Sequence, residues 1–198
     1  VFADLTRATQ ISRETGEPLI EFCALINMAE VAYAMGDLDR ASETTERSIA
    51  LARQLWGEAN RELFACELLL ARIALLRGTF EPARALLDRI RTRLSEAEAQ
   101  GSEEMRLLPA EQAQFDMVEL GSRDADEAEW HAFEQRYQSI EMQTLEQIDI
   151  LDGHALAALR AGRREESRRM FEFALSLSRD KPNLVSERVA RHYSASFA

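Results

Sequence analysis

Apolar and polar residues recur along this chain with the spacing of amphipathic helices. Within residues 22–55, Leu25, Met28, Ala29 and Ala32 recur at helical intervals and form one apolar face, and a second apolar stripe follows. No run of Val, Ile and Thr alternates with polar residues as a half-buried strand would. The pattern predicts helices over residues 3–15, 21–35, 38–55, 61–77, 80–99, 103–120, 125–141, 145–161, 164–179 and 184–195.

Glycines recur at nearly constant spacing between these helices. Gly36, Gly78 and Gly162 each follow an Ala-rich apolar stretch and precede another helix, and Gly121 is a weaker fourth. The intervals between the four glycines are 42, 43 and 41 residues. Glycine readily adopts the left-handed backbone that ends a helix, and Asp37 offers an oxygen to cap the next helix. The chain is therefore predicted to form repeated antiparallel helix hairpins.

Small residues around these glycines resemble the tetratricopeptide repeat family, in a variant longer than its usual repeat of about 34 residues. That family places small residues where paired helices touch and a glycine at the turn. The matching residues are Ala29, Gly36, Ala41 and Ser48, then Ala71, Gly78, Ala83 and Ile90, then Ala155, Gly162, Ser167 and Ala174. Ile90 departs from the small-residue pattern, as does Gln114 in the third repeat. The resemblance implies an all-α, right-handed superhelical stack of antiparallel helix hairpins.

We expect one array over residues 1–198. It would hold the second helix of a truncated repeat (1–20), repeats at 21–60, 61–102 and 144–182, a degenerate acidic repeat at 103–143, and a capping or next-repeat helix at 183–198. Asp124 and Glu127 predict a capping box in the acidic repeat. The chain opens on Val1 without an initiator Met, so we expect a fragment of a longer protein. Exposed apolar ends of such an array are expected to self-associate.

Composition and charge narrow the function. The chain is 46% hydrophobic and 30% charged with a net charge of −11, of which residues 103–149 contribute −10. This acidic segment argues against nucleic-acid binding and predicts a basic partner there. The longest apolar stretch, 68–76, is interrupted by Arg72 and is too short to span a membrane. We expect a cytoplasmic protein with no membrane partner, whose isolated Cys23 and Cys66 are reduced.

No motif predicts catalysis, a cofactor or a metal. His131, His154 and His192 lie in different predicted helices with no ligand spacing in common. His154 stands out because it lies inside a predicted helix beside Ala155, yet one imidazole makes no site. Gly-rich phosphate loops and nucleophile elbows are also missing from the sequence. The sequence therefore predicts that the chain is not an enzyme.

The resemblance implies that first helices line a concave ligand face. It assigns the partner-binding face to Asn27, Glu30, Tyr33, Leu69, Arg72 and Leu76, and in the fourth repeat it offers Asp149, Asp152, Leu156 and Arg160. Leu69 and Leu76 could equally be buried against a neighbouring helix. The function expected is a non-catalytic protein- or peptide-binding scaffold or sensor module of a larger, bacterial-type signalling or regulatory protein. The alternative is a quorum-type, peptide-sensing regulator array that switches an attached effector domain.

Overall fold

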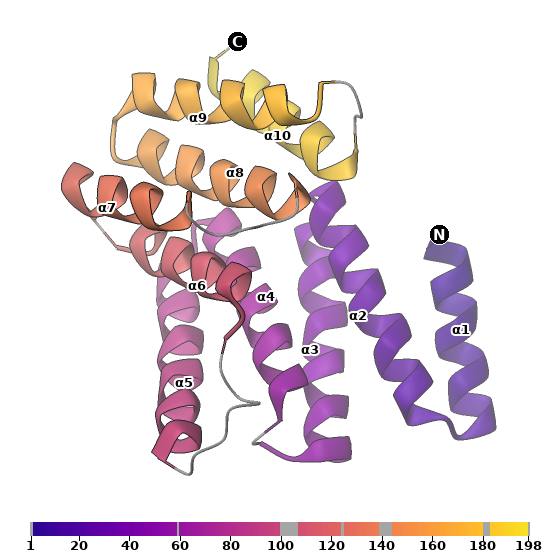
Figure 1. Cartoon of the computed structure of the whole chain (residues 1–198). Coiled ribbons are helices and arrows are strands. Elements are labelled where there is room, and N and C mark those ends of the chain that lie inside the picture. Colours follow the sequence, from indigo (N-terminus) through magenta and orange to yellow (C-terminus); the bar gives the residue numbers. More distant parts are fainter. Residues whose placement is uncertain are drawn as a thin grey trace. The chain divides into compact units, whose positions relative to one another are not determined.

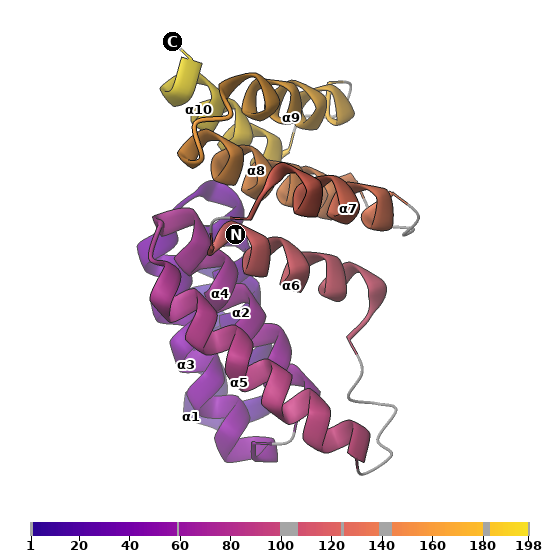
Figure 2. The same cartoon turned by 90° about the vertical axis from the view of Figure 1, so that its left-hand side faces the viewer.

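The computed structural model describes residues 2–58, 60–99, 107–123, 125–138, 144–179 and 183–197, and within these ranges it contains ten α-helices and no strand. Figures 1 and 2 show the helices in two views. Their bounds are α1 Phe2–Thr15, α2 Pro18–Met35, α3 Leu38–Trp56, α4 Arg61–Arg77, α5 Phe80–Ala99, α6 Pro109–Gly121, α7 Glu127–Tyr137, α8 Thr144–Arg160, α9 Arg164–Leu177 and α10 Leu184–Phe197. The all-α fold class is confirmed.

Three of the four repeat glycines end helices as predicted. Gly36, Gly78 and Gly162 have φ angles of 77°, 73° and 77°, in the left-handed backbone region that residues with a Cβ rarely adopt. After Gly36, the side chain of Asp37 accepts a hydrogen bond from the backbone N–H of Arg40 at 3.3 Å and caps α3. Each of these turns is thus set by its own local sequence.

Gly121 has a different role. It is the last residue of α6, and its φ is not positive. A Cβ at this position would lie 2.9 Å from Cδ1 of Leu75 and 3.6 Å from Cβ of Ala157. Gly121 is needed for close packing of helices and does not make a left-handed turn.

The start of α7 corrects one prediction. Its N-cap is Asp126, whose carboxylate accepts a hydrogen bond from the N–H of Glu129 at 2.9 Å. In turn, the carboxylate of Glu129 accepts a hydrogen bond from the N–H of Asp126 at 3.0 Å, which completes a capping box. The box predicted from Asp124 and Glu127 was therefore two residues too early, and Asp124 itself lies outside the described residues. The two pairs have the same spacing and chemistry, so the sequence alone could not separate them.

The chain divides into two compact units. Unit 1 comprises Val1–Ile73 and Ala85–Arg106, and unit 2 comprises Ala74–Arg84 and Leu107–Ala198. In unit 1, α2 packs against both α1 and α3. A core cluster there joins Phe22 of α2, Ile49 and Ala52 of α3, and Leu63 and Cys66 of α4.

Unit 2 is built around α8. This helix packs against α6, α9 and α10 (Figure 1), and its Ile148, Leu151 and Ala155 form a core with Phe171 and Val189. A buried ion-pair network reinforces the core. The guanidinium of Arg188 on α10 donates to the carboxylates of Asp149 at 2.6 Å and Asp152 at 2.9 Å on α8. Buried charges need such pairing, because an unpaired one would be strongly destabilising.

The small residues of the predicted hairpins are buried. Ala29, Ala71 and Ala155 have no exposed surface, and the same is true of Ala41, Ser48, Ala83, Ser167 and Ala174. Small side chains at such positions let helix backbones approach closely. Ile90 and Gln114, the two departures from the pattern, are buried as well.

Helix α2 is the one helix in the described part of the chain with the length and apolar composition of a candidate membrane span. Its mean hydropathy over Pro18–Met35 is 1.3. Core helices and signal sequences meet the same criterion, so this is weak evidence for a membrane role. In the structure α2 contributes Phe22 and Leu25 to the buried core of unit 1.

Candidate functional site

The six residues of the predicted partner-binding face do not share one exposed surface. Asn27 and Glu30 are exposed on α2, whereas Tyr33, Leu69 and Arg72 are buried. Leu76 is half-buried and belongs to unit 2, while the other five belong to unit 1. Partner binding by these six residues stays a prediction. Of the five that belong to unit 1, only Asn27 and Glu30 have exposed side chains that could contact a partner directly.

Local contacts explain why these side chains differ. The amide of Asn27 donates to the carbonyl of Cys23 in its own helix at 2.7 Å, so this amide is already engaged. The guanidinium of Arg72 lies over the ring of Tyr33, 4.6 Å from its centroid, and joins α4 to α2 by a cation–π contact. Leu69 was one of two residues for which burial was the open alternative, and in the structure it is buried.

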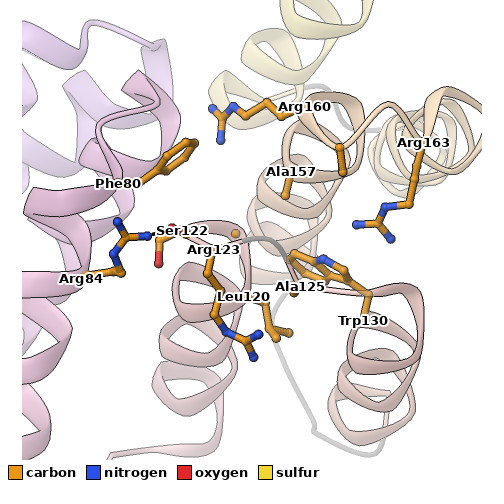
Figure 3. Close-up of a pocket in the computed structure, with 12 residues that line it drawn as sticks. Phe80, Arg84, Leu120, Ser122, Arg123, Ala125, Trp130, Ala157, Arg160 and Arg163 are labelled. Carbon is orange, nitrogen blue, oxygen red and sulfur yellow. Dashed lines mark hydrogen bonds between the residues drawn. The ribbon is translucent and has the colours of Figure 1, made fainter.

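A cavity in unit 2 gathers the most distinctive side chains. It has a volume of about 440 Å³, and four arginines from three stretches of the chain line it (Figure 3). We call it the arginine pocket. Its lining residues are Phe80, Arg84, Leu120, Gly121, Ser122, Arg123, Ala125, Trp130, Ala157, Arg160, Ala161 and Arg163.

Three of the four arginines are paired with carboxylates. The two terminal nitrogens of Arg123 donate hydrogen bonds to the carboxylate of Glu129, at 3.1 and 2.6 Å. Arg163 donates to both oxygens of Glu166, at 3.0 and 2.8 Å. Arg84 donates to Glu81 and to the backbone carbonyl of Ser122. These pairs hold the guanidinium groups in place and neutralise much of their charge.

Arg160 is the exception among the four. Its guanidinium donates to the backbone carbonyl of Leu75 at 2.9 Å and lies 5.2 Å from the centroid of the Phe80 ring. Neither contact supplies a negative charge. The surrounding pocket lowers the pKa of Arg160 from its usual value by partly desolvating the guanidinium. A guanidinium group in a protein is always cationic, and the remaining N–H groups of Arg160 suit an anion that enters the cavity.

The walls add apolar surface to these donors. In Figure 3, Phe80 lies on the side of Arg84, and Trp130 lies on the side of Arg163. A pocket with fixed cationic donors and apolar walls can bind a carboxylate or phosphate whose carrier is partly apolar.

Sequence reasoning found part of this pocket. The repeat pattern offered Arg160 as a first-helix position of the fourth repeat, but Asp149 and Asp152 from the same set are buried against Arg188. Arg84 and Arg123 had no distinguishing pattern. The contact between Arg160 and Leu75 joins residues 85 positions apart, and helical periodicity does not predict contacts at that range.

A scan against protein-family models finds no match to this chain, and a search of curated proteins finds no similar sequence.

Proposed function

We propose that this chain is a non-catalytic, tetratricopeptide-like repeat module of a signalling or regulatory protein in the cytoplasm. In this proposal it recognises an acidic segment of a protein or peptide through the arginine pocket. The observation that carries it is Arg160, a cation at the cavity wall whose described contacts are a carbonyl and an aromatic ring. An incoming carboxylate would supply the missing counter-charge and form a charge-assisted hydrogen bond.

The repeat architecture is part of the proposal, including the right-handed superhelical stack. Its support is the recurrence of left-handed glycines at Gly36, Gly78 and Gly162 together with the burial of the small residues around them. Stacked helical repeats commonly present surfaces for extended ligands.

A recognition role fits the chemistry of the pocket. The twelve lining residues include no histidine, carboxylate or cysteine that could act as a general base or a thiol nucleophile. Their guanidinium groups supply donors, and their aromatic and small side chains supply apolar contacts. A protein or peptide is the proposed partner because the net charge of −11 repels a polyanionic nucleic acid.

Peptide selection tests this function. Random peptides displayed on phage would be selected on the wild-type chain, and the affinity of a selected peptide would then be measured by fluorescence anisotropy. We expect enrichment in Asp and Glu. Arg160→Met should weaken binding roughly tenfold to a hundredfold, because a hydrogen bond to a charged group contributes about 1.5–3 kcal/mol.

The matched control is Arg179→Met, which removes one positive charge from an exposed position of the same unit, outside the pocket. We expect this variant to bind the peptide like the wild type. Selected peptides without acidic enrichment, or equal binding by the wild type and Arg160→Met, would show that the proposed function is wrong.

A further inference from the structure

A second group of polar side chains in unit 2 surrounds a buried histidine. His154 lies in the middle of α8 with no exposed surface. Its ring is stacked on Trp130, with centroids 4.1 Å apart and planes 6° from parallel. Stacking fixes the imidazole plane and leaves both ring nitrogens at the edge. Glu166 of α9 faces Nε2 at 2.9 Å, and Glu134 of α7 faces Nδ1 at 3.4 Å.

The contacts of Glu166 determine which nitrogen carries the proton. Arg163 donates hydrogen bonds to both oxygens of Glu166, which is the contact pattern of an arginine–carboxylate pair. An ionised carboxylate only accepts hydrogen bonds, so Nε2 of His154 must donate to it. A neutral imidazole carries a proton on only one of its two nitrogens. Nδ1 therefore carries a bare lone pair.

Among the described residues, that lone pair has no hydrogen-bond partner. Nδ1 is fully buried and unsatisfied, although Oε1 of Glu134 lies 3.4 Å away. A cation placed between two such electron-rich atoms would satisfy both of them. Two zinc–ligand bonds of about 2.1 Å that span 3.4 Å would meet at an angle of about 110°, which is close to tetrahedral.

We propose that Nδ1 of His154 and the carboxylate of Glu134 bind a divalent transition-metal ion of the zinc type, with His131 as a third ligand. The proposed ligands come from two helices, His131 and Glu134 from α7 and His154 from α8. Oxygens of Glu134 and Glu166 and a nitrogen of His154 all lie within 4.8 Å of one another. His131 lies one turn before Glu134 on α7, with its Nδ1 4.0 Å from Oε2 of Glu134.

In this arrangement Glu166 positions the ring and does not bind the ion. A carboxylate that accepts from the distal N–H of a metal-binding imidazole fixes its tautomer and orientation, as Glu166 does here. Arg163 in turn holds Glu166. The orientation of the His154 ring on α8 is thus fixed by a carboxylate and a guanidinium from the start of α9.

The surroundings allow an ion to enter. His131, Glu134 and Glu166 line a cavity of about 690 Å³ together with Glu127, Ala128, Arg169 and Met170. Because His131 and Glu134 line this cavity, it opens their side of the proposed site to solvent. Arg169 and Glu127 add one charge of each sign to the lining of this cavity. Imidazole ligands select borderline transition metals over Mg²⁺ and Ca²⁺, which prefer sites made of oxygen alone.

Zinc titration of the whole chain tests this site. Chelator-treated protein would be titrated with ZnCl2 by isothermal calorimetry, and CoCl2 would report coordination through its visible absorption. We expect one Zn²⁺ per chain. Glu134→Gln and His131→Gln should each weaken binding by at least roughly tenfold, and Glu166→Gln by roughly tenfold to a hundredfold through loss of ring orientation.

The matched control is Glu127→Gln, which removes a carboxylate from the same cavity without touching His154, and it should bind Zn²⁺ within about twofold of the wild type. Circular dichroism of each variant would verify the fold. Lack of Zn²⁺ binding by the wild type, unchanged binding in Glu134→Gln or His131→Gln, or equal competition by Ca²⁺ would overturn the proposal. Because no peptide is present, this result is independent of the function proposed for the arginine pocket.

Discussion

Single charged residues inside unit 1 are neutralised by neighbours that lie far away in the sequence. Glu67 on α4 has no exposed surface, yet Arg53 of α3 reaches it at 3.2 Å, Arg89 of α5 reaches it at 3.6 Å, and Arg93 of α5 pairs with it as well. Several guanidinium groups around one carboxylate compensate the desolvation of that carboxylate. Removal of Glu67 would leave these arginines without their shared partner.

Cys66, next to Glu67, illustrates how the same burial controls reactivity. Burial, together with the nearby carboxylates of Glu62 and Glu30, raises the pKa of its thiol to about 12. Cys23, by contrast, is exposed. Since the thiolate is the reactive species, we expect Cys23 alone to react with a disulfide reagent at pH 8.

Labelling with such a reagent, followed by mass spectrometry of proteolytic fragments, checks this expectation. Cys66 should be modified only after the chain is unfolded in denaturant, and Cys23→Ser should abolish labelling of the native protein. Rapid modification of Cys66 in the native Cys23→Ser variant would contradict the burial of its thiol.

Residues of both sites show where sequence reasoning stops. Arg160 was recognisable as a candidate because it has a defined place in a repeat. His154 was noticeable by its helix-interior position, but Glu134 and Glu166 lie 20 and 12 positions away in other helices. Such convergence depends on how helices pack, and an amphipathic pattern specifies a helix face without specifying what covers it. The fully buried histidine nitrogen becomes visible only when the helices are placed.

At the scale of the element, helix bounds were the most predictable feature. Helices α4 and α5 match their predicted ranges residue for residue, because glycine turns and apolar periodicity are local. Gly153, inside α8, was missed: a Cβ there would collide with the sulfur of Met117 on α6. Its signal was a glycine inside a helical pattern, which often marks a close approach.

Small residues at helix contacts give a test of packing. Ala71 on α4 is fully buried, so Ala71→Leu should overpack its surroundings and lower the free energy of unfolding by about 1–3 kcal/mol. Ala65 lies on the same helix but is exposed, and Ala65→Leu should change stability by less than about 0.5 kcal/mol. Urea unfolding followed by circular dichroism compares the two. Equal stability of both variants would mean that Ala71 tolerates a larger side chain and is not at a tight contact.

At the scale of the whole molecule, the charge distribution bears on both proposals. Residues 103–149 carry −10 of the net charge of −11. In addition, three of the four pocket arginines are paired with carboxylates, which reduces the positive charge of the pocket. The positive character of the arginine pocket is therefore local and centred on Arg160, whereas the field at longer range is negative. The prediction that residues 103–149 bind a basic partner still stands, and it is separate from the proposal for the arginine pocket.

The long-range negative field and the local positive charge of Arg160 should have different effects on the kinetics of binding. For an acidic peptide, the negative field of the whole chain slows the encounter, and salt screens that field, since the Debye length falls from about 30 Å at 0.01 M to about 10 Å at 0.1 M. We expect the association rate constant in stopped-flow fluorescence to rise with salt over this range. The weakening caused by Arg160→Met should persist at 0.1 M salt, because the guanidinium is partly enclosed and is screened less than an exposed charge. A lysine-rich peptide should show the opposite salt dependence, with slower association at higher salt. If the acidic peptide instead associates more slowly as salt rises, the arginines control its approach from a distance, and the pocket is more strongly positive than its carboxylate pairs imply.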